Sequence, residues 1–321
     1  MPAWSQLAGM SLTRRSLYPF VLAAMLDTPP RERPSLRVLD FPAGDGVLSF
    51  ALAASGFRVE AADLFPEYFA DGLERARSSG LGAASLFERT TGASLPRWLS
   101  DAMAPEPGVD PRVLPVPLDI RCVPADMEGE CPLPAGSFDR VVCVEGIEHV
   151  VDRHATLNLL RSLLAPGGRL MLTTPNLLSL RSRAAFALAG QRAFKSYIDE
   201  YTSVWGRSPD GSRTYHGHAF LLNYFQLRYS LHHCGFRIRR LWPSNWSPSS
   251  LLMSPVIPLV WAATAYSQRR AKRRFVSYQR SGLAPEDADP PYREMMRHLL
   301  SPSMLFNATL IVEAEAVARS A

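Results

Sequence analysis

The stretch Arg37-Val38-Leu39-Asp40-Phe41-Pro42-Ala43-Gly44-Asp45-Gly46-Val47-Leu48-Ser49 decides the fold of this 321-residue chain. It combines a short apolar strand, a loop of small residues, and an amphipathic helix that begins near Leu48. A second strand follows from Arg58 to Ala62 and ends on Asp63. Strand, glycine loop, helix, strand and acid in this order are typical of the first βαβ unit of a nucleotide-binding sheet.

The residue types in the loop indicate what kind of ligand it can bind. Gly44 and Gly46 remove side chains where a ligand would approach the backbone. Asp63 follows about twenty residues later, where a carboxylate can accept hydrogen bonds from both hydroxyls of a ribose. Pro42 lacks an N–H but keeps its carbonyl oxygen, so it suits a ligand amine better than a pyrophosphate, which prefers N–H donors.

These residues resemble the first motif of class I S-adenosylmethionine (SAM)-dependent methyltransferases, an apolar pair followed by Asp-x-Gly-x-Gly-x-Gly. Asp40, Gly44 and Gly46 match the motif, and Pro42 replaces its first glycine. Two later segments, LPAGSFDRVVC from Leu133 and APGGRLMLTTPN from Ala165, are also similar to segments of this family. The resemblance covers about residues 36 to 176 well and the last third loosely, and the chain is also similar to the O-methyltransferases of ubiquinone biosynthesis.

The resemblance implies a fold and a cofactor. The expected fold is α/β, a doubly wound, seven-stranded, Rossmann-like sheet with an antiparallel last strand, and the expected cofactor is SAM. In such a site Asp63 would hold the ribose, Asp126 would accept from the adenine amino group, and Met127 would pack on the adenine ring. The remaining residues expected at the cofactor are Asp40, Pro42, Gly44, Gly46 and Glu145.

Periodicity and turn residues predict the other elements. The expected helices span residues 12–26, 66–78, 95–103, 155–164, 177–189 and 223–234. The expected further strands span residues 116–125, 140–144, 169–173, 236–241 and 308–314. Apart from the short helix at 95–103, residues 80–115 read as a loop-like insertion.

Four segments are expected along the chain. Residues 1–35 form an N-terminal helical segment, and residues 36–242 form the SAM-binding core. Residues 243–306 form an apolar and basic insertion, and residues 307–321 supply the last core strand and a tail.

Glu145, Glu148 and His149 form the candidate catalytic group. If the chain is helical from Glu145, these three side chains share one face and, with His218, can bind a divalent cation. The arrangement resembles the Glu-x-x-Glu-His set of metal-dependent 2′-O-methyltransferases that act on small-RNA ends. Without a metal, Glu145 would line the cleft and His149 or His218 would act as general base.

Methyl transfer to an oxygen is the expected reaction, because the Asn/Asp-Pro-Pro-Tyr motif of many amino-methylating relatives is absent. The expected acceptor is a small molecule, a glycan or a lipid-linked compound. Two other classes remain open from the sequence: an NAD(P)-dependent oxidoreductase on a related sheet, and a non-catalytic, membrane-associated protein with this fold.

An uncharged segment from Ser250 to Ser267 precedes the basic run Arg269 to Arg274. Pro255 and Pro258 interrupt the segment, which is too short to favour a bilayer span. An interfacial helix or hairpin on an anionic membrane is one interpretation. A lid over the cleft or a dimer interface is the other.

Composition limits the remaining possibilities. The formal net charge of +5 is mild and does not indicate nucleic acid as a partner. Cys122, Cys131, Cys143 and Cys234 show no zinc-like spacing and indicate free thiols in a reducing compartment. Because no N-terminal signal peptide is evident, we expect a cytoplasmic enzyme, peripheral on the membrane if the interfacial interpretation holds. The sequence does not indicate an oligomeric state.

Overall fold

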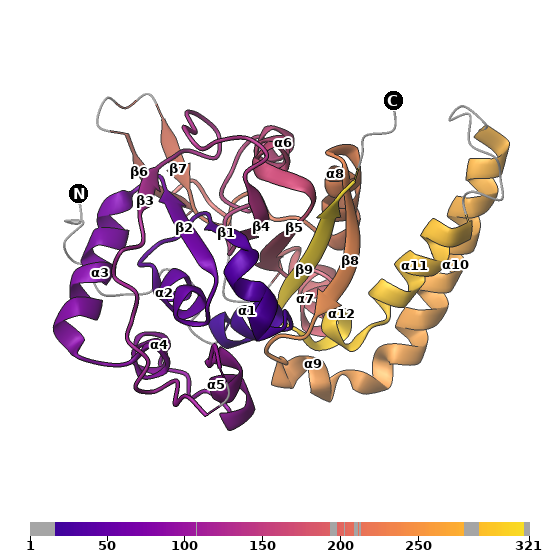
Figure 1. The fold of residues 1–321 in the computed structure, drawn as a ribbon. Helices are drawn as coiled ribbons and strands as arrows, with labels where there is room; N and C mark the ends of the chain where they lie inside the picture. The colour runs from indigo at the N-terminus through magenta and orange to yellow at the C-terminus, as the bar shows by residue number, and fades with distance from the viewer. Residues whose placement is uncertain are drawn as a thin grey trace.

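A computed structural model describes residues 17–106, 108–192, 198–201, 203–208, 211, 213–278 and 289–317. Its centre is a seven-stranded sheet with the order β3-β2-β1-β4-β5-β9-β8 (Figure 1). The strands are β1 (Arg37–Asp40), β2 (Arg58–Asp63), β3 (Cys122–Pro124), β4 (Phe138–Cys143), β5 (Leu164–Pro175), β8 (Phe236–Trp242) and β9 (Thr309–Ala316).

The direction of the strands confirms the expected fold class. The first five strands pair in parallel, while β9 runs antiparallel to both β5 and β8. Because β1 lies between β2 and β4, the carboxyl ends of these three strands meet at one edge of the sheet.

Helices cover both faces of the sheet. They are α1 (Tyr18–Met25), α2 (Val47–Ala54), α3 (Pro66–Ser79), α4 (Ala83–Thr91), α5 (Arg97–Met103), α6 (Arg153–Leu163), α7 (Leu180–Ala189), α8 (Tyr224–His233), α9 (Pro248–Leu252), α10 (Ile257–Tyr278), α11 (Asp289–Leu299) and α12 (Pro302–Phe306). Two short 3₁₀ helices, η2 (Pro30–Ser35) and η3 (Ser254–Val256), complete the set, and a separate hairpin joins β6 (Val204–Arg207) to β7 (Thr214–His216).

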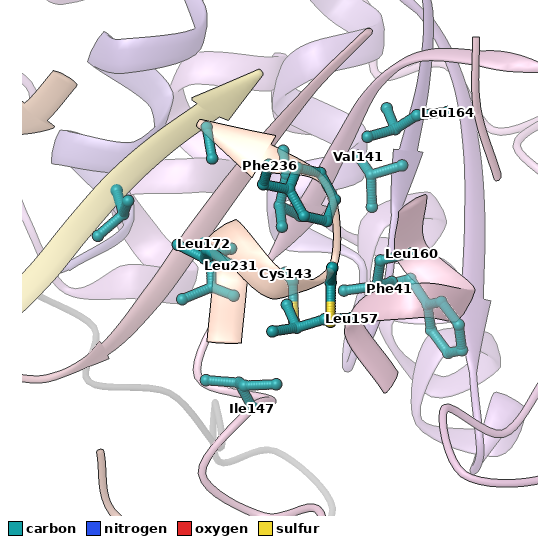
Figure 2. Close-up of a cluster of buried hydrophobic side chains, with 14 of the residues drawn as sticks. Phe41, Val141, Cys143, Ile147, Leu157, Leu160, Leu164, Leu172, Leu231 and Phe236 are labelled. Atoms are coloured by element: carbon teal, nitrogen blue, oxygen red, sulfur yellow. The ribbon is translucent and has the colours of Figure 1, made fainter. Parts of the chain in front are cut away.

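Alternation along the strands divides the core in two. Val38 and Val142 pack with α1, α2, α4 and α5 on one face, while Leu39 and Val141 pack with α6 and α8 on the other. Figure 2 shows the second cluster, in which Phe41 and Val141 are both labelled among the buried side chains. The side chains of β1 and β4 are therefore buried from both sides, which fixes the register of the strands that lead to the sheet edge.

Two sequence predictions about local structure are wrong, and a third holds in part. Residues 83–91 form α4, although the many small residues around them suggested a loop. The third strand covers only Cys122–Pro124, because Pro117 cannot donate to a ladder and the chain before it bonds to α4 through Leu114. The predicted turn at 165–168 falls inside the bounds of β5, but its residues bulge out of the ladder: Leu164 pairs with Phe138, the next pair is Arg169 with Arg140, and Gly167 has φ +73°.

The other expected elements are present within a few residues of their predicted bounds. The first residues of the predicted helix at 12–26 lie outside the described part of the chain, and its described portion is α1. Asn223 and Gln226 form a capping box at the start of α8, and the side chain of Asp152 caps α6.

Within residues 243–306, the helices α10 and α11 are antiparallel neighbours. They lie side by side and stand away from the sheet on the β8 side, in orange and yellow in Figure 1. Helix α11 is held to α8, since Arg228 pairs with Glu294 at 3.0 Å and the hydroxyl of Tyr224 lies 2.7 Å from Nδ1 of His298.

Candidate active site

A cavity of about 340 Å³ opens at the carboxyl edge of β1, β2 and β4. It is lined by the glycine loop, the ends of these strands and the β6–β7 hairpin. Most of the residues predicted for the cofactor or the chemistry line it: Pro42, Gly44, Asp63, Asp126, Met127, Glu145, His149 and His218. The sheet edge therefore brings together side chains that are up to 176 positions apart in the chain, since the first and last of these are residues 42 and 218.

Gly44 and Gly46 have different structural roles. Gly44 has φ +54°, and a Cβ atom built on it would meet nothing within 4 Å, so its backbone faces open space at the cavity. Gly46 has φ +76°, and its Cβ would lie 2.7 Å from the Phe69 ring and 2.8 Å from the Phe50 ring. The first glycine keeps room in the cavity, whereas the second lets α2 pack on α3.

Asp40 lies outside the residues that line the cavity. It is buried, and Oδ2 accepts a hydrogen bond of 2.7 Å from the hydroxyl of Ser49 in α2. Burial raises the pKa of Asp40 to about 7. Asp40 thus joins helix α2 to strand β1 through Ser49.

Asp63 ties the end of β2 to the glycine loop. Its Oδ2 accepts from the backbone N–H of Gly44 at 2.8 Å, and its Oδ1 accepts from that of Phe65 at 2.8 Å. Burial raises the pKa of this carboxyl. Each carboxylate oxygen has a second acceptor position, so Asp63 can still accept from ligand hydroxyls.

Asp126 lies two residues beyond Pro124, which pairs with Asp63 in the β2–β3 register. Both of its carboxylate oxygens accept from the guanidinium of Arg213, and Nη2 of Arg213 also reaches Glu128 at 3.2 Å. This partner was not predicted, because Arg213 lies 87 residues further along the chain in a polar segment. A ligand amine at Asp126 would share this carboxylate with Arg213.

Glu145 does not begin a helix, so the predicted common face of Glu145, Glu148 and His149 is wrong. Its φ is +46°, and its backbone N–H donates to the hydroxyl of Thr173 at 2.9 Å in a turn after β4. Non-glycine residues rarely adopt this conformation, and those that do cluster at functional sites. Glu145 lines the cavity but is not part of the compact ligand group described next.

Glu148, His149 and His218 come together, with one ligand atom from each lying within 4.8 Å of the others. Glu148 is fully buried, and neither of its carboxylate oxygens has a hydrogen-bond partner among the described residues. Nε2 of His218 lies 3.9 Å from Oε1 of Glu148, and burial raises the pKa of Glu148 to about 8. A buried carboxylate without a partner is costly, so the group is chemically suited to a cation.

The hydrogen bonds of the two imidazoles differ. Nδ1 of His149 lies 2.9 Å from the carbonyl oxygen of His216, which can only accept, so Nδ1 carries the proton and Nε2 keeps its lone pair. Burial lowers the pKa of His149, which favours the neutral ring. Nδ1 of His218 lies 3.4 Å from the guanidinium of Arg192, so in this conformation Nε2 carries the proton of a neutral His218.

Aromatic rings from the β6–β7 hairpin form one wall of the cavity. Trp205 and Tyr215 both contact the ring of Phe65 edge-on, at centroid distances of 6.2 Å and 5.2 Å. Trp205 also lies 6.3 Å from the ring of His149. This hairpin was not predicted from the sequence, because its two strands have only four and three residues. Of the two candidate catalytic histidines, only His218 lies next to it in the chain.

The fold and the cavity together define a SAM-dependent methyltransferase, with a Rossmann-like sheet, an antiparallel β9, and the motif residues gathered at the carboxyl edge. A comparison with known families supports this class. The methyltransferase domain family matches residues 13–241, most of the chain, and the chain belongs to this family. The alternatives of a nicotinamide-dependent oxidoreductase and of a non-catalytic scaffold have no support from this membership.

Curated relatives carry a more specific name. Ubiquinone biosynthesis O-methyltransferases of Xanthomonas campestris pv. campestris and Xanthomonas axonopodis pv. citri are each 37% identical to this chain. The matches extend over 156 and 153 residues, which are 49% and 48% of this chain and 48% and 47% of the relatives. The chain therefore spans about half the length of the curated relatives it matches.

Solved structures of SAM-dependent methyltransferases are also similar to this chain. Those from Mesorhizobium loti and Methanosarcina mazei are both 14% identical, with TM-scores of 0.38 and 0.43. The matches cover 90% and 88% of this chain, and 99% and 93% of those chains.

Proposed function

We propose that this enzyme transfers a methyl group from SAM to an oxygen atom of a small-molecule acceptor. The observation that carries this proposal is His149, whose Nε2 lone pair is available at the same cavity as Gly44 and Asp63. The name of the curated relatives, O-methyltransferase, points to the same acceptor atom.

The residues at the cavity fit SAM. Gly44 leaves open space at its Cα, and Asp63 presents a carboxylate with further acceptor positions. Asp126 and Met127 line the same cavity, and we propose that they contact the adenine. Pro42 and Met127 both pack close to Gly146, so that a Cβ there would lie 2.9 Å from Pro42 and 3.2 Å from Met127. Pro42 and Met127 therefore leave only a narrow space at Gly146, which suits a flat ring.

Bound SAM supplies an electrophilic methyl group, so the chain must chiefly position the acceptor and remove its proton. His149 is oriented by the His216 carbonyl and kept neutral by burial, which are the properties of a general base. The aromatic wall of Phe65, Trp205 and Tyr215 favours an acceptor with a ring or another apolar part. A lipid-linked acceptor is compatible with this wall, and a cytoplasmic location remains our prediction.

We propose further that Glu148, His149 and His218 hold a divalent cation, without Glu145. A cation at this position would lower the pKa of an acceptor hydroxyl. Glu148 can bind a cation only when its carboxyl group is ionised, and His218 only when Nε2 has lost its proton. Nδ1 of a neutral His218 then carries the proton, so the ring gives up its contact with Arg192 when it binds the cation. In the absence of a cation, His149 alone accepts the proton.

The test of oxygen methylation uses labelled SAM and matched acceptors. Phenols, aliphatic alcohols and amines, each with and without an apolar tail, are offered to wild type and His149→Gln. We expect label on oxygen with wild type, a loss of at least about 100-fold in His149→Gln, and unchanged SAM binding by calorimetry. Label found on nitrogen, or full activity in His149→Gln, would contradict the proposal.

The cation is tested by measuring bound metal rather than activity. Wild type, Glu148→Gln, His218→Ala and the control His154→Ala are loaded with Mg²⁺, Mn²⁺ or Zn²⁺, desalted and analysed for bound metal. His154 lies beside His233, at 5.4 Å between ring centroids, outside the cavity. We expect bound metal in wild type and His154→Ala and its loss in the other two. Equal metal in all four proteins, or none in wild type, would reject the site.

A further inference from the structure

The solvent-facing side of α9, η3 and α10 combines exposed apolar residues with a basic end. Leu252, Leu259 and Tyr266 are 82%, 70% and 65% exposed. Pro248 to Gln268 contains no charged side chain, and five of the six residues from Arg269 to Arg274 are basic. Exposed apolar groups in one contiguous patch mark an interaction site on most proteins.

The exposed residues of α10 form one stripe. Leu259, Ala263, Tyr266, Arg270 and Arg273 are all exposed and follow each other at spacings of three or four, so they lie on one side of the helix. Nη1 of Arg270 donates to the hydroxyl of Tyr266 at 3.2 Å, which joins the apolar and basic halves. On the opposite side Val260, Thr264 and Gln268 are partly buried, and α10 contacts α11.

We infer that this stripe, with Leu252 of α9, docks the enzyme on an anionic lipid bilayer. Leucine, tryptophan and tyrosine side chains insert at the boundary between headgroups and acyl chains, and arginines bind anionic headgroups. The stripe carries both kinds of residue in sequence, with Leu259 and Tyr266 followed by Arg270 and Arg273. Among the described residues no helix is long and apolar enough to cross a membrane.

The structure links this stripe to the active site through α7. The backbone N–H of Arg181, at the start of α7, donates to the hydroxyl of Ser250 in α9 at 3.2 Å. Arg192, shortly after the end of α7, contacts His218. Helix α7 therefore connects the proposed membrane-facing helices α9 and α10 with the cavity. A cavity connected to the membrane surface in this way suits an acceptor with an apolar part. The docking itself does not depend on the proposed reaction.

Flotation of the full chain with vesicles tests the inference. We use phosphatidylcholine vesicles with and without phosphatidylglycerol, at low and high salt. The variants are L252D/L259D and R269Q/R273Q. Matched controls are V113D, since Val113 is 74% exposed on another part of the molecule, and R112Q/R121Q, whose side chains are also exposed.

We expect wild type and both controls to float with anionic vesicles at low salt. Partitioning should fall about 30-fold in R269Q/R273Q and about tenfold or more in L252D/L259D, with SAM binding retained in every variant. Wild type that fails to float, or L252D/L259D that floats equally well, would overturn the inference. A wild-type dimer that L252D/L259D converts to monomer without vesicles would assign the surface to a second copy instead and also overturn it.

Discussion

Oδ2 of Asp63 accepts a hydrogen bond of 2.8 Å from the backbone N–H of Gly44, so the acid at the end of β2 holds the loop at the end of β1. One side chain thereby shapes the loop and presents its remaining acceptor positions to the cavity. Because Asp63 both holds the loop and offers acceptor positions to a ligand, cofactor binding should depend on it more than on any other residue.

Asp63→Asn should weaken SAM binding by at least about tenfold, because one acceptor oxygen becomes an NH₂ donor facing either an N–H or a ribose hydroxyl. Calorimetric titration with SAM measures the loss. Asp139→Asn is the matched control: Oδ2 of Asp139 accepts from the backbone N–H of Arg37, also at 2.8 Å, at the opposite end of β1. An equal loss of affinity in the two variants would show that the effect is general destabilisation.

Alanine at Gly44 and at Gly46 should have different effects. Gly44→Ala places a methyl group in open space and costs about 1–2 kcal/mol of backbone strain, but it should reduce SAM affinity because the methyl enters the cavity. Gly46→Ala forces a Cβ to within 2.9 Å of two phenyl rings and should lower the free energy of unfolding by about 1–3 kcal/mol more. Thermal unfolding and SAM titration of both variants separate these effects. Equal losses of stability would contradict the distinction.

Asp40 should make wild-type stability fall as pH rises. The folded protein keeps Asp40 protonated up to about pH 7, whereas the unfolded chain releases this proton near the ordinary pKa of aspartate. Between these two values the folded state binds more protons than the unfolded state, so the free energy of unfolding falls with pH and then levels off above about 7.

Asp40→Asn removes this titration and serves as the comparison. Denaturant unfolding of both proteins from about pH 5 to about pH 8, a range that brackets the folded-state pKa of about 7, should show the wild type losing stability relative to the variant. The loss should be about 1.4 kcal/mol per pH unit at most. Parallel curves would mean that Asp40 is ionised throughout.

Arg213→Gln should strengthen SAM binding, because the adenine amino group would no longer compete with a guanidinium for Asp126. The pair is partly exposed, with side-chain exposures of 33% and 15%, so the gain should be modest, at most about fivefold. Calorimetry gives the affinity, and Arg207→Gln, on the paired strand β6, is the control. Weaker binding in Arg213→Gln would mean that the hairpin is part of the cofactor's cover.

The fold was largely predictable, because its signals are local. The glycine loop, Asp63 and the alternating apolar strands can each be recognised from a few consecutive residues. The order of the strands in the sheet follows once the family is known. The elements that were missed lack such a signal. Helix α4 has only nine residues and lies between Gly82 and Gly92, and Pro117 shortened β3.

The site was predictable in composition but not in geometry. Glu148, His149 and His218 were expected to meet, but the helical face that included Glu145 was not present, because the chain turns with positive φ at that residue. Arg213 and Trp205 were not anticipated, since only tertiary contacts bring the β6–β7 hairpin to Asp126 and Phe65.

The position of β9 sets the order in which this sheet can be completed. Strand β8 leaves the ribosome before β9, yet within the described sheet it bonds only to β9, and β9 in turn bonds to β5. Until Thr309–Ala316 is synthesised, both β5 and β8 present open edges that can pair with other chains. A nascent chain that stops after α11 is therefore the form most prone to aggregation. Its open strand edges are protected only by a factor that binds them during synthesis.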